Sequence, residues 1–260
     1  MKTISFINLK GGVGKTTISV NFAYAVAKMY GEKILFIDND KQGNATDWLS
    51  RHDGSEYGSI THILMGDVTA DNIQEAIQPT VHENIDLIAG DMGIIEAHAK
   101  LLKSDNINQA TVIRDALEPV TDKYKLCIID NPPDINLSVF NTLSITDDVV
   151  IVTTTEKDSL DGMYLMLQQV KSLQQYNPYL NLKGLLINQY LTSAANYNLF
   201  DRLQQEQLPI FNTKIRYASQ KAKRHMDMAR KEGKTLLEKS PNCHVARDII
   251  KFTKEFFGER

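Results

Sequence analysis

The chain has 260 residues, of which 42% are hydrophobic and 23% are charged, and its net charge is −3. This composition excludes a disordered tail, a collagen-like fibre and a uniformly basic nucleic acid binder, and its two distant cysteines suggest neither a disulfide framework nor a zinc site. The opening residues reach a glycine pair too soon for a secretory signal, and no run approaches the ~20 apolar residues of a membrane-spanning helix. We therefore expect a soluble, cytoplasmic protein in which residues 1–260 form a single domain.

Short apolar runs alternate with longer segments that carry apolar residues at helical spacing. The runs predict buried strands over residues 3–9, 33–38, 84–90, 125–130, 147–153, 182–188 and 208–215. The longer segments predict helices over residues 16–30, 106–120, 160–176 and 194–207. This alternation predicts an α/β fold, a doubly wound, mostly parallel sheet with helices on both faces. Residues 51–84 indicate only an exposed loop followed by short helices.

A glycine-rich segment, KGGVGKTT, joins the first predicted strand to the first predicted helix. Glycines let consecutive backbone N–H groups turn toward an anion, and the helix N-terminus adds its dipole. In such a loop Lys15 can reach the β and γ phosphates, the Thr16 hydroxyl can ligate Mg²⁺, and Thr17 is placed for the α phosphate. The standard spacing is not met because Leu9 stands where the first glycine belongs. We predict a phosphate-binding loop of a deviant form, made of Lys10, Gly11, Gly12, Val13, Gly14, Lys15, Thr16 and Thr17.

Carboxylates stand at the ends of two predicted strands. Asp38 and Asp40 lie at the end of the strand over 33–38, and Asp130 ends the strand over 125–130. In parallel sheets, ligands bind beyond the carboxyl ends of the strands, which places these groups beside the phosphate loop. A carboxylate in the position of Asp130 can hold the hydration shell of Mg²⁺ opposite Thr16. The alternative is that these aspartates simply end their strands at the surface.

The phosphate loop resembles that of the deviant Walker A ATPases, the ParA/MinD group. In that family an early lysine crosses a dimer interface and touches the nucleotide of the partner subunit, and Lys10 matches this lysine. The resemblance implies an ATP hydrolase, slow without a partner protein, with ATP and Mg²⁺ as cofactors. It also implies that ATP is held between two subunits, so that ATP binding and dimerisation are linked.

Further positions match the family residue by residue. Asp40 matches the residue of switch I (here residues 38–44) that positions or deprotonates the attacking water, and Asp38 is the weaker candidate, as a group near the metal. Asp130 begins switch II (residues 130–133), and Asn188 matches an asparagine that reads the adenine edge. The resemblance thus implies catalytic roles for Lys10, Lys15 and Asp40, metal binding by Thr16 and Asp130, and base contact by Asn188.

The sequence departs from the family pattern at two places. Lys41 replaces the proline of switch I, so we expect a looser switch with a cation near Asp40 and lower or differently regulated hydrolysis. Ile215 and Arg216 stand where the family commonly has a proline near the base. The resemblance therefore does not identify the other residues of the base pocket.

A basic segment spans residues 214–234, with eight basic and two acidic side chains in a chain of net charge −3. On a helix, Lys221, Arg224 and Lys231 would share roughly one face, a stripe that suits phosphates better than bases. The resemblance implies DNA binding without sequence preference, mainly by the ATP dimer. The candidate contacts are Lys214, Arg216, Lys221 and Arg224; the alternative is an ordinary solvated face.

The C-terminal segment from Val245 is amphipathic, and we expect it to dock on the core. The alternative is a membrane anchor, which is the role of the corresponding helix in MinD-type relatives. The leading prediction is a ParA-type ATPase for plasmid or chromosome partition: an ATP-dependent homodimer that binds DNA, associates with the nucleoid, and hydrolyses ATP when stimulated by a ParB-like partner. The alternatives are a MinD-like ATPase that cycles on a membrane and a metabolic enzyme with the same fold.

Overall fold

The computed structural model describes residues 1–51, 56–103 and 110–259. In this part of the chain a seven-stranded sheet has the order β3-β4-β2-β5-β1-β6-β7. All neighbouring strands are parallel except the short edge pair β3 and β4. The strands are β1 (Lys2–Ile7), β2 (Ile34–Asp38), β3 (Gln78–Pro79), β4 (Ile85–Ile88), β5 (Leu126–Asp130), β6 (Asp148–Thr153) and β7 (Asn181–Ile187).

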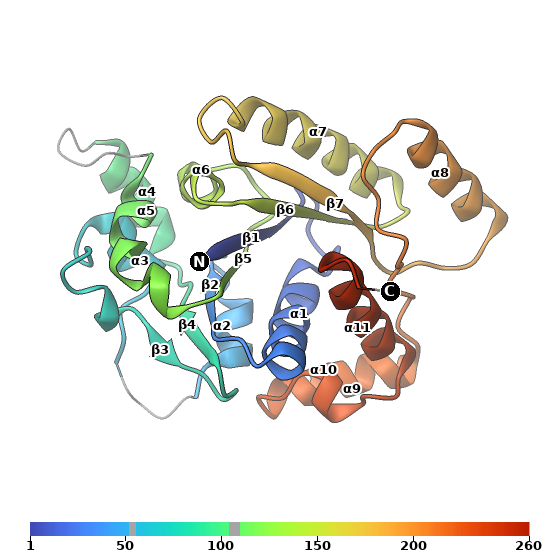
Figure 1. Ribbon diagram of the computed structural model, residues 1–260, viewed down its shortest axis with the longest axis horizontal. Coiled ribbons are helices and arrows are strands. Elements are labelled where there is room, and N and C mark those ends of the chain that lie inside the picture. The colour runs from blue at the N-terminus through green and yellow to red at the C-terminus, as the bar shows by residue number, and fades with distance from the viewer. Residues whose placement is uncertain (52–55, 104–109, 260) are drawn as a thin grey trace.

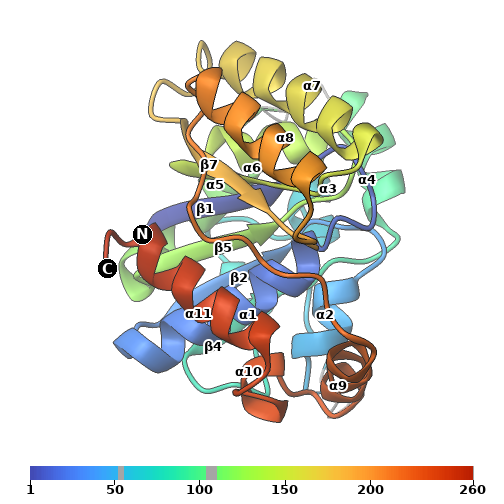
Figure 2. The ribbon, with the colours of Figure 1, turned by 90° about the vertical axis from the view of Figure 1, so that its right-hand side faces the viewer.

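Helices cover both faces of the sheet (Figure 1). The two faces are also separated in the perpendicular view, with α7 on one side of the sheet and α1, α9 and α11 on the other (Figure 2). The predicted doubly wound, mostly parallel α/β fold is confirmed. The helices are α1 (Lys15–Tyr30), α2 (Asn44–Leu49), α3 (Ile60–Met65), η1 (Ile73–Glu75), α4 (Ile94–Leu102), α5 (Val112–Leu117), η2 (Glu118–Lys123), α6 (Leu137–Ser144), α7 (Lys157–Leu173), α8 (Ala194–Gln205), α9 (Gln220–Lys231), α10 (Leu236–Lys239) and α11 (His244–Phe256).

The central strands are apolar on both sides because each side is covered. Along β5, Ile128 packs in the cluster that includes α1 and α11, whereas Cys127 and Ile129 pack in the cluster that includes α4 and α5. Successive side chains of a strand point to opposite faces, so a continuous apolar run is what such a doubly covered strand requires. Cys127 is fully buried, as expected for a small core residue.

The amphipathic C-terminal helix α11 packs on the core through aromatic rings. Phe252 and Phe256 lie 5.4 and 5.2 Å from Phe22 of α1, measured between ring centroids, and Val245 is buried with them. The apolar face of α11 is therefore occupied by the protein itself. Among the described helices, none is both long and apolar enough to cross a membrane.

The predicted strand over residues 208–215 does not form. Here the structure describes an isolated parallel bridge of Ile210 with Leu185 of β7, and a second bridge, of Arg216 with Tyr190, just beyond both segments. Between them the backbone N–H groups of Asn212 and Thr213 donate to the Glu255 carboxylate, at 2.6 and 2.8 Å, instead of to a neighbouring strand. A side chain of α11 thus interrupts the ladder.

The predicted helix over residues 106–120 is shorter, and its residues 106–109 lie outside the described part of the chain. The described part is α5, which passes at Glu118 into the 3-10 turns of η2. Pro119 accounts for the change because proline has no N–H to continue the α-helical bonds. In residues 56–84 the structure forms α3, η1 and the edge strand β3; residues 52–55 are outside the description.

The docking of α11 predicts a large loss of stability for Phe252→Ala. Removal of this fully buried ring leaves a cavity, so the free energy of unfolding should fall by about 3–5 kcal/mol in urea denaturation. Lys254→Ala, an exposed change on the same helix, should leave it near the parent value. Equal stability of the two variants would contradict the packing of α11.

Candidate functional site

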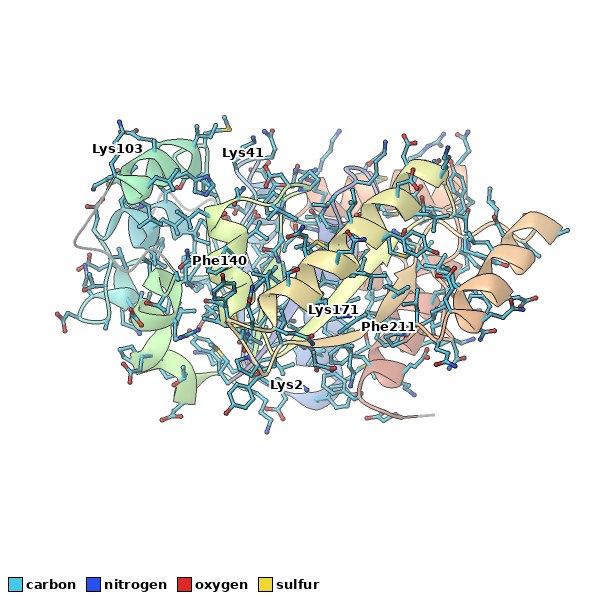
Figure 3. All side chains as sticks on the ribbon, turned by 90° about the horizontal axis from the view of Figure 1, so that it is seen from above. Lys2, Lys41, Lys103, Phe140, Lys171 and Phe211 are labelled. Carbon is cyan, nitrogen blue, oxygen red and sulfur yellow. The ribbon has the colours of Figure 1, made fainter. Side chains whose placement is uncertain are left out.

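The candidate site lies at the edge where the parallel strands end. Figure 3 shows Lys2, the first residue of β1, at one edge of the molecule and Lys41, which follows β2, at the opposite edge. A cavity of about 450 Å³ opens at the phosphate loop. Of the residues predicted for the site, those that line it are Gly11, Gly12, Gly14, Lys15, Thr16, Thr17, Asp40 and Asn188.

The phosphate loop turns through two glycines with positive φ angles, Gly12 at 76° and Gly14 at 91°. A side chain at Gly14 would also collide with the amide of Asn188. Glycine is therefore required at this position both by the positive φ angle and by the lack of space. The end of β7 holds the loop in place: Asn188 Nδ2 donates to Val13 O at 2.7 Å, and Gln189 Nε2 donates to Gly12 O at 2.9 Å. The predicted base-reading residue Asn188 therefore also supports the loop.

The two lysines of the loop have different surroundings. Lys15 is buried beneath the loop, where its Nζ donates to Asn8 O at 3.2 Å. Burial lowers the pKa of Lys15, and the carboxylates of Asp130 and Asp40 oppose that shift. Lys10 instead lies at the surface, where its Nζ is 3.2 Å from Asp158 Oδ2 and its side chain is 42% exposed. Only Lys15 is directed into the site of its own chain.

Asp130 faces Thr16 across the site. The Thr16 hydroxyl donates to Asp130 Oδ2 at 2.6 Å, while the buried Oδ1 has no hydrogen-bond partner among the described residues. Burial, and then the neighbouring charge of Asp38, raises the pKa of Asp130 to about 8. A hydroxyl and a buried carboxylate oxygen in need of a partner are hard ligands that suit Mg²⁺, so the residues present fit this ion.

Asp38, on the strand next to Asp130, anchors the turn that follows β2. Its Oδ2 accepts from the Thr46 N–H and hydroxyl, both at 2.8 Å, and its Oδ1 accepts from the Asp40 N–H at 3.1 Å. Burial raises the pKa of Asp38 to about 6, although the bonds from Thr46 act against the shift. One carboxylate oxygen thus holds switch I at Asp40, and the other holds the first turn of α2 at Thr46.

Asp40 lies within this turn and lines the cavity. Its Oδ1 accepts from the Gln42 N–H at 3.0 Å, and Gly43, with a φ of 60°, leads into α2. Asp38 and Thr46 hold the two ends of the turn, and Asp40 lines the same cavity as the phosphate loop. Sequence reasoning missed Thr46 and Gln189; the only local signal is that Gln189 follows Asn188 at a strand end.

The four residues predicted to contact DNA have different surroundings. Lys214 Nζ lies 3.4 Å from the centre of the Phe200 ring, and burial lowers the pKa of Lys214. Arg216 lines the cavity and makes a two-point contact with Asp248, with Nε–Oδ2 and Nη2–Oδ1 distances of 2.8 Å. Lys221 and Arg224 are exposed on α9, where no described residue hydrogen-bonds or pairs with their side chains.

The geometry defines a phosphate loop on a parallel sheet, and comparison with known proteins gives its family. Residues 1–182 match the model of an AAA domain family. The chain is 30% identical to the sporulation initiation inhibitor protein Soj of Bacillus subtilis, over 98% of this chain and 97% of Soj. It is 32% identical to the chromosome partitioning protein ParA of Myxococcus xanthus, over 75% of this chain and 67% of that protein. The chain belongs to the ParA/MinD family of deviant Walker A ATPases.

A solved structure of an enzyme that is named as a synthase has the same fold. Cobyrinic acid a,c-diamide synthase from Mycobacterium smegmatis, with bound ADP and magnesium, superposes with a TM-score of 0.80 at 24% identity, over 98% of this chain and 94% of that one. Because a synthase shares the fold, the fold alone does not determine the reaction, and the argument for function must come from the site.

The raised pKa of Asp130 predicts that magnesium binding depends on pH. Below its pKa of about 8 the carboxyl is protonated, and a proton must leave before the metal can bind. The affinity for Mg²⁺ in the presence of ADP should therefore rise about eightfold from about pH 7 to about pH 8.5, measured by calorimetric titration. Asp130→Asn should weaken binding and remove the pH dependence; a flat profile for the parent would contradict the assignment.

Proposed function

We propose that this protein is a ParA-type ATP hydrolase that partitions DNA as an ATP-dependent homodimer. The observation that carries the proposal is the combination, around one cavity, of the buried Lys15, the Thr16–Asp130 contact with its unpartnered carboxylate oxygen, and Asp40. The exposed Lys10 stands at the rim of the same loop. Such a set suits a nucleoside triphosphate better than a neutral ligand, because its cations and N–H groups converge on an anion.

Hydrolysis follows from the placement of these groups. Backbone N–H groups of the loop bind the phosphate oxygens, and Lys15 offsets their charge at the β and γ positions. Thr16 and Asp130 would hold Mg²⁺, which supplies further positive charge to the phosphate oxygens. Asp40 orients a water molecule and accepts its proton as the water oxygen bonds to the γ phosphorus, and the bond from that phosphorus to the β–γ bridging oxygen breaks. The products are ADP and phosphate.

The surroundings of Lys10 support a role in dimerisation. Its contact with Asp158 joins two exposed side chains, 42% and 74% accessible, and contacts of this kind contribute little to stability. Lys10 can therefore leave Asp158 for the triphosphate of a partner subunit at small cost. We propose that Lys10 completes the partner's site, so that ATP binding and pairing occur together.

DNA would bind to the exposed side of α9. Lys221, Arg224 and Lys231 are exposed there, and a dimer would present two such helices. Side chains of this type neutralise phosphates without reading bases, which gives binding without sequence preference. Partition through a ParB-like partner that stimulates hydrolysis, and a cytoplasmic, nucleoid-associated location, complete the proposal; a chromosome partitioning protein is among the relatives.

The alternatives have less support from the site. A MinD-like membrane cycle needs an apolar helix face that can leave the protein, whereas the face of α11 is buried through Phe252 and Phe256. A metabolic enzyme on this fold would turn over ATP only with a small second substrate. Liposome binding that needs residues after Val245, or substrate-dependent turnover, would favour these alternatives in turn.

The proposal is tested by measuring dimer mass and DNA retention with ATP, with ADP and without nucleotide. The parent should form a DNA-bound dimer only with ATP. Lys10→Ala should remain a monomer even with a slowly hydrolysed ATP analogue, because the partner's triphosphate loses its second lysine. Asp40→Ala should dimerise and stay on DNA, because its ATP is not cleaved. Normal dimerisation of Lys10→Ala would refute the shared site, and normal release of Asp40→Ala would remove Asp40 from its role.

The exposed side of α9 predicts a characteristic salt dependence. With about four phosphate contacts for each subunit, the dimer should lose DNA affinity with a logarithmic salt slope of about −7. The double variant Lys221→Ala/Arg224→Ala removes two cations from each subunit and should reduce the slope to about −4. Arg247→Ala/Lys251→Ala, an equal charge change on exposed positions of α11, should keep the parent slope. Equal slopes for the two double variants would place DNA elsewhere.

A further inference from the structure

Helix α9 carries cations on two sides. It buries Ala222 and Ala229, and Lys221 and Arg224 are exposed. Lys223 and Arg230, about two helical turns apart and so on one side of the helix, line the same cavity as the phosphate loop. One helix therefore faces both the proposed DNA surface and the nucleotide site.

Arg230 bonds from this helix to the start of α2. Its Nη2 donates to Asn44 Oδ1 at 2.9 Å and lies 3.4 Å from Asp47 Oδ2. Both contacts are made by the same nitrogen, so one end of the guanidinium links α9 to two residues of α2. Helices α2 and α9 are in contact, and Figure 2 shows them next to each other.

The start of α2 is also the end of switch I. The Gly43 N–H donates to Asp40 O at 2.9 Å, and Asn44 follows directly. A second bond joins α2 to the segment that follows α9, because Trp48 Nε1 donates to Lys234 O at 2.7 Å. A continuous set of contacts thus runs from Asp40, which lines the cavity, through Asn44 to Arg230 and α9.

The cavity supplies a reason for these contacts to change with the nucleotide. Arg230 lines the same cavity as the phosphate loop, and ATP would bring more negative charge into this cavity than ADP. The attraction of the guanidinium to the cavity would therefore differ between the two states, and it would compete with the contacts to Asn44 and Asp47. A ligand shifts a structural equilibrium only through such a difference.

We propose that Arg230 is a positioning residue that couples the state of the nucleotide to DNA binding by α9. Its contact with Asn44 at the end of switch I is exposed and can be exchanged at small cost, so that a change at the γ phosphate alters how α9 presents Lys221 and Arg224. This inference rests on the proposed function, since it assumes that ATP favours DNA binding. It adds the residue through which the two sites communicate.

The test compares DNA dissociation constants with a slowly hydrolysed ATP analogue and with ADP, each nucleotide at a saturating concentration for every variant. The ratio of the two constants measures the coupling. Arg230→Ala should lower this ratio by about fivefold or more, and Arg230→Lys should restore it in part, because lysine keeps the charge but not the planar guanidinium. Arg247→Ala, the loss of an exposed arginine on α11, should keep the parent ratio.

Asn44→Ala removes the partner of Arg230 in the same contact and should also lower the ratio. This variant provides the test if Arg230→Ala does not fold. Thermal unfolding confirms which variants are folded. If folded Arg230→Ala or Asn44→Ala keeps the ratio of Arg247→Ala, the coupling role is overturned. A parent whose DNA affinity is the same with the analogue and with ADP would instead overturn the proposed function on which the inference rests.

Discussion

Two buried carboxylates stand side by side on neighbouring strands, and the site is organised around them. Asp38 and Asp130 are register partners of β2 and β5, and burial raises the pKa of both. The nearby Lys15 is buried too, and its pKa is lowered. Charges taken out of water are costly unless they are paired and hydrogen-bonded. Asp40 and Thr46 donate to Asp38, and the Thr16 hydroxyl donates to one oxygen of Asp130, so both buried carboxyl groups are hydrogen-bonded to the segments that cover them.

Buried amides join the strand ends to one another. Asn8 accepts from the Lys10 N–H at 3.0 Å, and Asn188 donates to Val13. Asn39, just after β2, donates to Asn131, just after β5, at 3.0 Å. Short polar side chains can satisfy the backbone of a loop that leaves a sheet, where no further strand is available. The phosphate loop and both switches are therefore fixed to a rigid edge, which suits a site that must hold a polyphosphate in one orientation.

The same arrangement explains how one small chain could serve two ligands. Residues of the phosphate loop and of α9 line one cavity, and other residues of that helix are exposed. The docking of α11 leaves the apolar C-terminal segment in the core and leaves cations at the surface. This arrangement suits the proposed binding of polyanions better than binding to lipid.

The sequence alone determined the alternation of strands and helices, the phosphate loop and the position of Asp130 after its strand. These depend on local chemistry: apolar runs, glycines that permit positive φ, and residue types at fixed spacing. Only the tertiary structure decided that Asp38 anchors switch I, that Arg216 pairs with Asp248, 32 residues away, that Glu255 interrupts the segment over 208–215, and that Arg230 meets Asn44. Each of these depends on a hydrogen bond between residues that are distant in the sequence. The spacing of residues along the chain does not predict which of them become partners.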